Sequence, residues 1–141
     1  MPVDLGSCLG CCSGSCGHCQ VVPAAWVIYD GKEFANGTCQ NCDVLNSDLT
    51  LVNVAPCDWQ IHNVQVCDDG FGTGYDFGYD PVGNQWVLIL FTVIGGGAPD
   101  RTAVWSIPDA QFNCLGINFL TIVTRDLPRC IYPNTMVVQP A

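Results

Sequence analysis

The feature that most constrains the fold of this chain is its cysteine content, eleven cysteines in 141 residues. Such a density is typical of metal binding in a reducing compartment and of disulfide bonds in an oxidising one. Because eleven is odd, at least one cysteine is free, bound to metal or joined to another chain. Five cysteines lie in the first 20 residues and six in the remainder, and the two groups stand in different sequence surroundings.

Residues 1–20 are rich in Cys, Gly and Ser and follow neither a helical nor a strand period. A segment with so much glycine is a poor helix or strand, and we interpret it as an irregular N-terminal arm. Its candidates for metal binding or cross-linking are Cys8, Cys11, Cys12, Cys16 and Cys19. Two C-x-x-C pairs can hold one zinc ion in a tetrahedral site. Disulfides, some of them to the rest of the chain or to another chain, are the alternative.

The arm also contains Cys16-Gly17-His18-Cys19, the active-site motif of protein disulfide isomerases. That chemistry needs the first cysteine at a helix N-terminus, where its thiolate is stabilised. Here the flanking residues, including Pro23, predict neither a preceding strand nor a following helix. The motif therefore gives little support to a redox enzyme.

Residues 21–141 read as one domain made of short β-strands separated by turns. Turn pairs such as Asp30-Gly31 and Asn36-Gly37 punctuate runs of alternating or apolar residues at a spacing typical of sandwiches and barrels. The run 85–94 is expected to be a fully buried strand, and 108–112 is expected to form at most one helical turn. We predict an all-β, disulfide-stapled antiparallel β-sandwich, jelly-roll-like or Ig-like, with the four tryptophans in its core.

The charge of the chain excludes several classes of function. Only 12% of the residues are charged and the formal net charge is −9, with no basic patch, which disfavours nucleic acid and anionic lipid as partners. The longest apolar run, 86–94, is too short to insert in a membrane. The first residues have neither a basic nor an apolar signal region. Two explanations fit these features: a signal segment has been removed, or the protein oxidises after release from a cytosol, as in a virion. We favour the second.

The six cysteines of the domain are candidates for disulfide bonds: Cys39, Cys42, Cys57, Cys67, Cys114 and Cys130. Six cysteines allow about 15 connectivities. The spacing suggests local pairs, such as Cys39 or Cys42 with Cys57 or Cys67, and Cys114 with Cys130.

An acidic, glycine- and aromatic-rich segment is a candidate calcium site or contact loop, through Asp68, Asp69, Phe71, Tyr75, Asp76, Tyr79 and Asp80. Calcium takes six or more oxygen ligands from a flexible loop, but the spacing matches no EF-hand. The alternative is a solvated hairpin loop whose tyrosines contact a protein neighbour. No catalytic motif stands out, so we expect a protein that is not an enzyme and needs no cofactor.

The order of motifs in residues 20–141 resembles a cysteine-rich β domain of uncharacterised planctomycete proteins and of some phage structural proteins. The resemblance is carried by Cys39-Gln-Asn-Cys42, by the segment 45–51, by Cys57-Asp-Trp59, and by later cysteines that flank β-rich runs. It implies a stapled β-sandwich in a virion or extracellular setting and transfers no catalytic residue.

These observations lead to three functional hypotheses. The first is a structural subunit of an extracellular assembly, such as a phage capsid decoration or tail protein, which contacts other subunits and forms a homo-oligomer. The second is a secreted or cell-surface adhesion module that binds glycan or protein through residues 71–80. The third is a metal-binding or redox protein that uses the cysteines of the arm.

Overall fold

The computed structural model describes residues 16–29, 49–62, 71–93, 100–125 and 134–141. Within these ranges the chain forms eight strands and one short 3₁₀ helix. The elements are β1 (Ala25–Tyr29), β2 (Leu49–Ala55), β3 (Asp58–Ile61), β4 (Phe71–Asp80), β5 (Gln85–Val93), β6 (Asp100–Pro108), η3 (Asp109–Gln111), β7 (Asn118–Arg125) and β8 (Thr135–Pro140). The all-β prediction is confirmed, and the single helical turn lies where the sequence predicted one.

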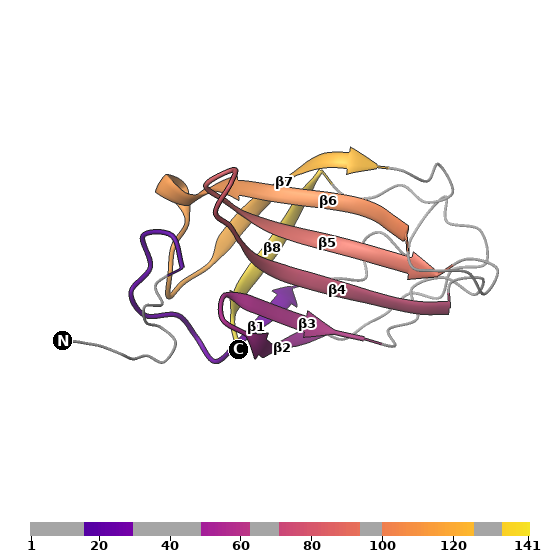
Figure 1. Ribbon diagram of the computed structural model, residues 1–141, viewed down its shortest axis with the longest axis horizontal. Coiled ribbons are helices and arrows are strands. Elements are labelled where there is room, and N and C mark those ends of the chain that lie inside the picture. Colours follow the sequence, from indigo (N-terminus) through magenta and orange to yellow (C-terminus); the bar gives the residue numbers. More distant parts are fainter. Residues whose placement is uncertain (1–15, 30–48, 63–70, 94–99, 126–133) are drawn as a thin grey trace.

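The strands form one closed antiparallel barrel in sequence order (Figure 1). Each strand pairs with the next along the chain, and β8 pairs with β1 through Trp26 opposite Pro140 and Ile28 opposite Val138. The predicted two-layer sandwich is therefore replaced by an eight-stranded barrel. Alternating strands are equally suited to either architecture, and the pairing of the first and last strands decides between them.

The core is formed by the inward residues of every strand, as the strand period of two requires. Trp26, Trp59, Trp86 and Trp105 are fully buried, which confirms that the tryptophans belong to the core. Phe77 packs against three of the ring systems around it, with centroids 5.5 Å from Trp26, 6.0 Å from Trp59 and 5.6 Å from Trp86. Aromatic packing of this kind fills the narrow interior of an eight-stranded barrel with side chains.

Strand β5 differs from the sequence prediction in one respect. Trp86, Leu88 and Leu90 are buried, whereas the side chains between them, Val87 and Ile89, are only half-buried on the outer surface. The outer side chains of this strand are apolar as well, and one of them, Ile89, lies opposite the apolar Val104 of β6.

Several connecting segments meet at one end of the barrel. The β2–β3 turn, the β4–β5 turn and η3 lie there, and the segment 16–24, drawn in indigo, covers the same end (Figure 1). Trp86 at the start of β5 stacks on Phe112 just after η3, with ring centroids 3.9 Å apart and an interplanar angle of 7°. This end of the barrel carries the candidate site.

The described part of the chain contains no helix long and apolar enough to cross a membrane.

Candidate functional site

The C-G-H-C motif forms a tight two-residue turn. Cys16 and Cys19 face each other as an antiparallel bridge, with N–H···O distances of 3.0 and 2.8 Å in the two directions. Gly17 has φ +56°, the left-handed region that favours glycine at such a turn. The motif therefore does not stand at a helix N-terminus, which is the setting that activates a disulfide isomerase cysteine.

The two cysteines of the turn are joined to two different parts of the barrel. Cys16 forms a disulfide with Cys57, and Cys19 forms a disulfide with Cys114. The local pairings suggested for Cys57 and Cys114 are therefore wrong. The reason lies in the topology, because the β2–β3 turn and the segment after η3 meet the N-terminal turn at the same end of the barrel.

Hydrogen bonds to backbone groups position both barrel cysteines. Cys57 adopts φ +61° in the β2–β3 turn, and its carbonyl accepts the Tyr79 N–H at 3.1 Å. A Cβ at Gly78 would lie 2.5 Å from that carbonyl oxygen, so glycine permits this approach. Cys114 lies in a loop closed by Asn118, whose amide accepts the Asn113 N–H at 2.7 Å and donates to the Asn113 carbonyl at 2.8 Å.

Asp109 is the buried polar centre of the site. Its carboxylate accepts the Trp86 indole N–H at 3.0 Å and the His18 backbone N–H at 3.0 Å, and it pairs with the His18 ring Nδ1 at 3.1 Å. Asp109 is 6% exposed, and its hydrogen bond from Trp86 is buried, whereas the His18 side chain is partly open to solvent. The contacts join the N-terminal turn to the barrel across 91 positions of the sequence.

The Asp109 carboxyl is held in its ionised form. Burial by itself would raise its pKa, but hydrogen bonds from Trp86 and His18 and the charge of His18 outweigh that effect, and the pKa is lowered. Gly17 makes this arrangement possible, since a Cβ there would lie 2.1 Å from the carboxylate Oδ1 and 2.8 Å from the Tyr79 ring.

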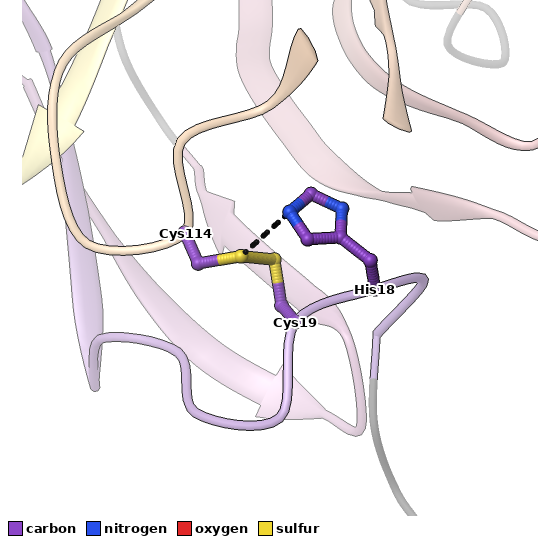
Figure 2. Close-up of side chains that lie close together, drawn as sticks. All are labelled: His18, Cys19 and Cys114. Carbon is purple, nitrogen blue, oxygen red and sulfur yellow. Dashed lines mark hydrogen bonds between the residues drawn. A yellow bond between two sulfur atoms is a disulfide. The ribbon is translucent and has the colours of Figure 1, made fainter. Parts of the chain in front are cut away.

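The His18 ring bridges Asp109 and the second disulfide. Its Nε2 lies 3.3 Å from the Cys114 Sγ (Figure 2). His18, Cys19 and Cys114 are also the one group of three potential metal ligands in the described part of the chain, with ligand atoms within 4.8 Å of one another. With both sulfurs in a disulfide there is no thiolate to bind zinc. The arrangement instead resembles a carboxylate–histidine–sulfur relay.

Other predicted site residues are only partly placed. Cys8, Cys11 and Cys12 of the arm lie outside the described residues. So do Cys39, Cys42, Cys67 and Cys130 of the domain, and Asp68 and Asp69 of the acidic segment. The sequence analysis missed Asp109 as a site residue. Its only signal was its position in the single predicted helical turn.

The predicted acidic aromatic loop is largely strand β4. Phe71 begins the strand, and Tyr75 and Phe77 point into the barrel and are buried. Tyr79 is half-buried and its hydroxyl donates to the Asn84 side chain at 2.7 Å. Tyr75 is therefore a core residue, and no cluster of three carboxylates with metal-ligand spacing occurs among the described residues.

Asp76 and Asp80 instead lie on the outer surface of β4, beside Asp58 of β3. These three side chains border an open hollow of about 340 Å³. Gln60 donates to the Asp58 and Asp76 carboxyls, both at 3.4 Å. Partial burial, together with the neighbouring Asp58, raises the pKa of Asp76 to about 7.

This raised pKa predicts a pH-dependent stability. The folded state retains the Asp76 proton up to about pH 7, whereas the unfolded chain loses it near 3.8, so folding stability falls as the pH rises through that window. After a discount for solvent screening we expect a loss of about 1–2 kcal/mol. The variant Asp76→Asn should lack this loss, measured as urea unfolding free energy at several pH values.

The matched control is Asp80→Asn at the end of the same strand. Hydrogen bonds from the Gln85 side chain and from the turn backbone lower the pKa of Asp80, so its variant should gain no stability at high pH. Parallel pH profiles for wild type and Asp76→Asn would show that Asp76 titrates normally in the folded protein.

Comparison of the chain with protein-family models, with curated proteins and with solved structures finds no match in any of the three.

Proposed function

We propose that this protein is a non-enzymatic structural subunit of an extracellular assembly, and that it packs against further copies of itself through one face of the barrel. The supporting observation is an apolar outer surface on four adjacent strands, β7, β8, β1 and β2. We call it the apolar face and define it by Phe119, Val123, Val137, Val27, Val52 and Val54.

Several side chains of the apolar face are more than half exposed to solvent. Phe119 and Val123 of β7 are both 60% exposed, and Val52 and Val54 of β2 are 54% and 51% exposed. Between them, Val137 lies opposite Phe119 in the strand register. Several exposed apolar side chains on neighbouring strands of one surface are a feature of protein interfaces.

The acidic surface on the rest of the barrel also favours association through the apolar face. Asp58, Asp76 and Asp80 make the outer surface of β3 and β4 acidic, and the chain carries a formal net charge of −9. Two copies would repel each other through their acidic surfaces and gain free energy by burying apolar ones. An isologous contact between apolar faces satisfies both conditions.

The setting of the assembly is proposed from the cysteines and from the resemblance of residues 20–141 to phage structural proteins. Two disulfides between distant segments are expected in an oxidising compartment or on a released particle. We propose a virion, with the protein as a capsid decoration or tail component. The scarcity of basic residues fits protein partners rather than nucleic acid.

Light scattering coupled to size-exclusion chromatography tests the role of the apolar face. We expect the oxidised protein to form a defined oligomer, and Phe119→Asp or Val52→Asp to weaken its association at least about tenfold because a charge would be buried. Val82→Asp is the matched control, since Val82 is 97% exposed in the β4–β5 turn, away from this face. A wild-type protein that stays monomeric at high concentration would overturn the proposal.

A further inference from the structure

The two described disulfides differ in one chemical respect. Each joins a buried cysteine to a partly exposed one: Cys16 to Cys57, and Cys19 to Cys114. Only the second has a histidine ring against it, with His18 Nε2 at 3.3 Å from the Cys114 Sγ. The other described histidine, His62, is bonded to Gln60 at 2.8 Å. Cys16–Cys57 is therefore an internal control for Cys19–Cys114, the disulfide that has a histidine neighbour.

Asp109 determines which nitrogen of the His18 ring faces the Cys114 Sγ. An ionised carboxylate only accepts hydrogen bonds, so the contact of 3.1 Å requires Nδ1 to carry the proton and leaves Nε2 toward Cys114. The result is an Asp109–His18–Cys114 relay, with the same order of roles as the triad of a cysteine nucleophile.

In that arrangement Nε2 takes the proton of an incoming thiol, and the imidazolium formed beside the sulfurs stabilises the departing thiolate, which makes thiol–disulfide exchange faster. A ring nitrogen of His18 and both sulfurs lie within 4.8 Å of one another, so either sulfur departs next to the ring (Figure 2). The His18 side chain is 47% exposed, which leaves this edge of the site open to solvent.

We propose that the Cys19–Cys114 disulfide is a thiol-exchange site, promoted by the Asp109–His18 pair and open to thiol-bearing molecules. An incoming thiolate attacks the partly exposed Cys114 Sγ, the bond to Cys19 breaks, and Cys19 leaves as a thiolate. A mixed disulfide remains on Cys114. A second thiol attacks the incoming sulfur of that mixed disulfide and releases Cys114 as a thiolate. Two thiols are oxidised to one disulfide, and the two protein sulfurs gain the two electrons and two protons.

The test compares the two disulfides within one molecule. The oxidised full-length protein is treated with reduced glutathione at neutral pH, quenched with acid at intervals, alkylated and analysed by peptide mass spectrometry. We expect Cys19–Cys114 to open about tenfold or more faster than Cys16–Cys57, with glutathione found first on Cys114. Equal rates, or faster opening of Cys16–Cys57, would overturn the proposal. This comparison needs no variant and so does not depend on how a variant folds.

Two variants test the role of the ring. His18→Gln keeps a polar side chain but removes the imidazole, and it should slow the opening of Cys19–Cys114 to about the rate of Cys16–Cys57 while leaving the latter unchanged. His62→Gln is the matched control and should change neither rate. An unchanged Cys19–Cys114 rate in His18→Gln would show that the ring has no part in exchange.

A second arm separates small thiols from protein thiols as the physiological reactant. A cysteine-containing peptide of net positive charge is added in place of glutathione, because the chain has a formal net charge of −9. Faster capture of the peptide on Cys114 would indicate a protein partner, and faster capture of glutathione a small thiol. Oligomer size measured on the same samples keeps this result distinct from the proposed assembly, which requires no exchange.

Discussion

Replacing Cys19 and Cys114 together by serine is expected to lower the free energy of unfolding by about 5 kcal/mol. This disulfide spans 95 positions of the sequence, and restricting so long a loop removes much of the entropy of the unfolded chain. A domain of this size is stable by only about 5–15 kcal/mol, so the variant should be close to unfolding. Urea denaturation followed by tryptophan fluorescence measures the change.

The matched control for this variant is Cys16→Ser with Cys57→Ser. That disulfide spans 41 positions, and the same entropic argument gives a loss of about 4 kcal/mol. The two double variants should therefore rank in the order of their loop lengths. A loss below about 1 kcal/mol for Cys19→Ser with Cys114→Ser would mean that the unfolded chain is not restricted by this bond.

Asp109→Ala is expected to destabilise the protein by about 3–5 kcal/mol. The substitution leaves the Trp86 indole N–H and the His18 backbone N–H without their acceptor, close to the core. It also removes the contact between the carboxylate and the His18 ring, which ties the N-terminal turn to the barrel. Asp109→Asn is the control that retains the size and one acceptor oxygen, and it should lose clearly less.

The pH dependence gives this prediction a second measurement. Because the pKa of Asp109 is lowered in the folded state, its carboxylate contributes stability above its unfolded pKa, near 3.8, and that contribution is lost as the pH falls through the lower folded value. The difference between wild type and Asp109→Ala should thus be largest near neutral pH and shrink in acid. A difference that grows in acid would contradict the ionised, hydrogen-bonded carboxylate.

Much of the barrel could be predicted from the sequence because its strands are defined by local patterns. Turn residues bound runs such as 102–107 and 118–124, and the period of two separates buried Leu120 from exposed Phe119. The four tryptophans could be assigned to the core from size and strand context alone. Closure into a barrel could not be predicted, because the β1–β8 pairing joins residues at opposite ends of the chain.

The candidate site was harder to predict, for the same reason. Cys16 and Cys19 look like a redox or zinc motif when only neighbouring residues are considered, and their partners lie 41 and 95 positions away. Nothing in the sequence near Asp109 indicates that its carboxylate accepts a hydrogen bond from His18. Tyr75 was wrongly assigned to a loop because its segment is rich in glycine. The segment is strand β4, and its aromatic residues Tyr75 and Phe77 face the core.

The most direct test of this account is a disulfide map of the oxidised protein, obtained by digestion without reductant at mildly acidic pH, which suppresses exchange. The central claim is that the C-G-H-C motif is a turn that fastens two segments of the barrel. It predicts peptides in which Cys16 is linked to Cys57 and Cys19 to Cys114. Peptides with Cys16 linked to Cys19 as the dominant form would contradict it and restore the motif as a redox pair.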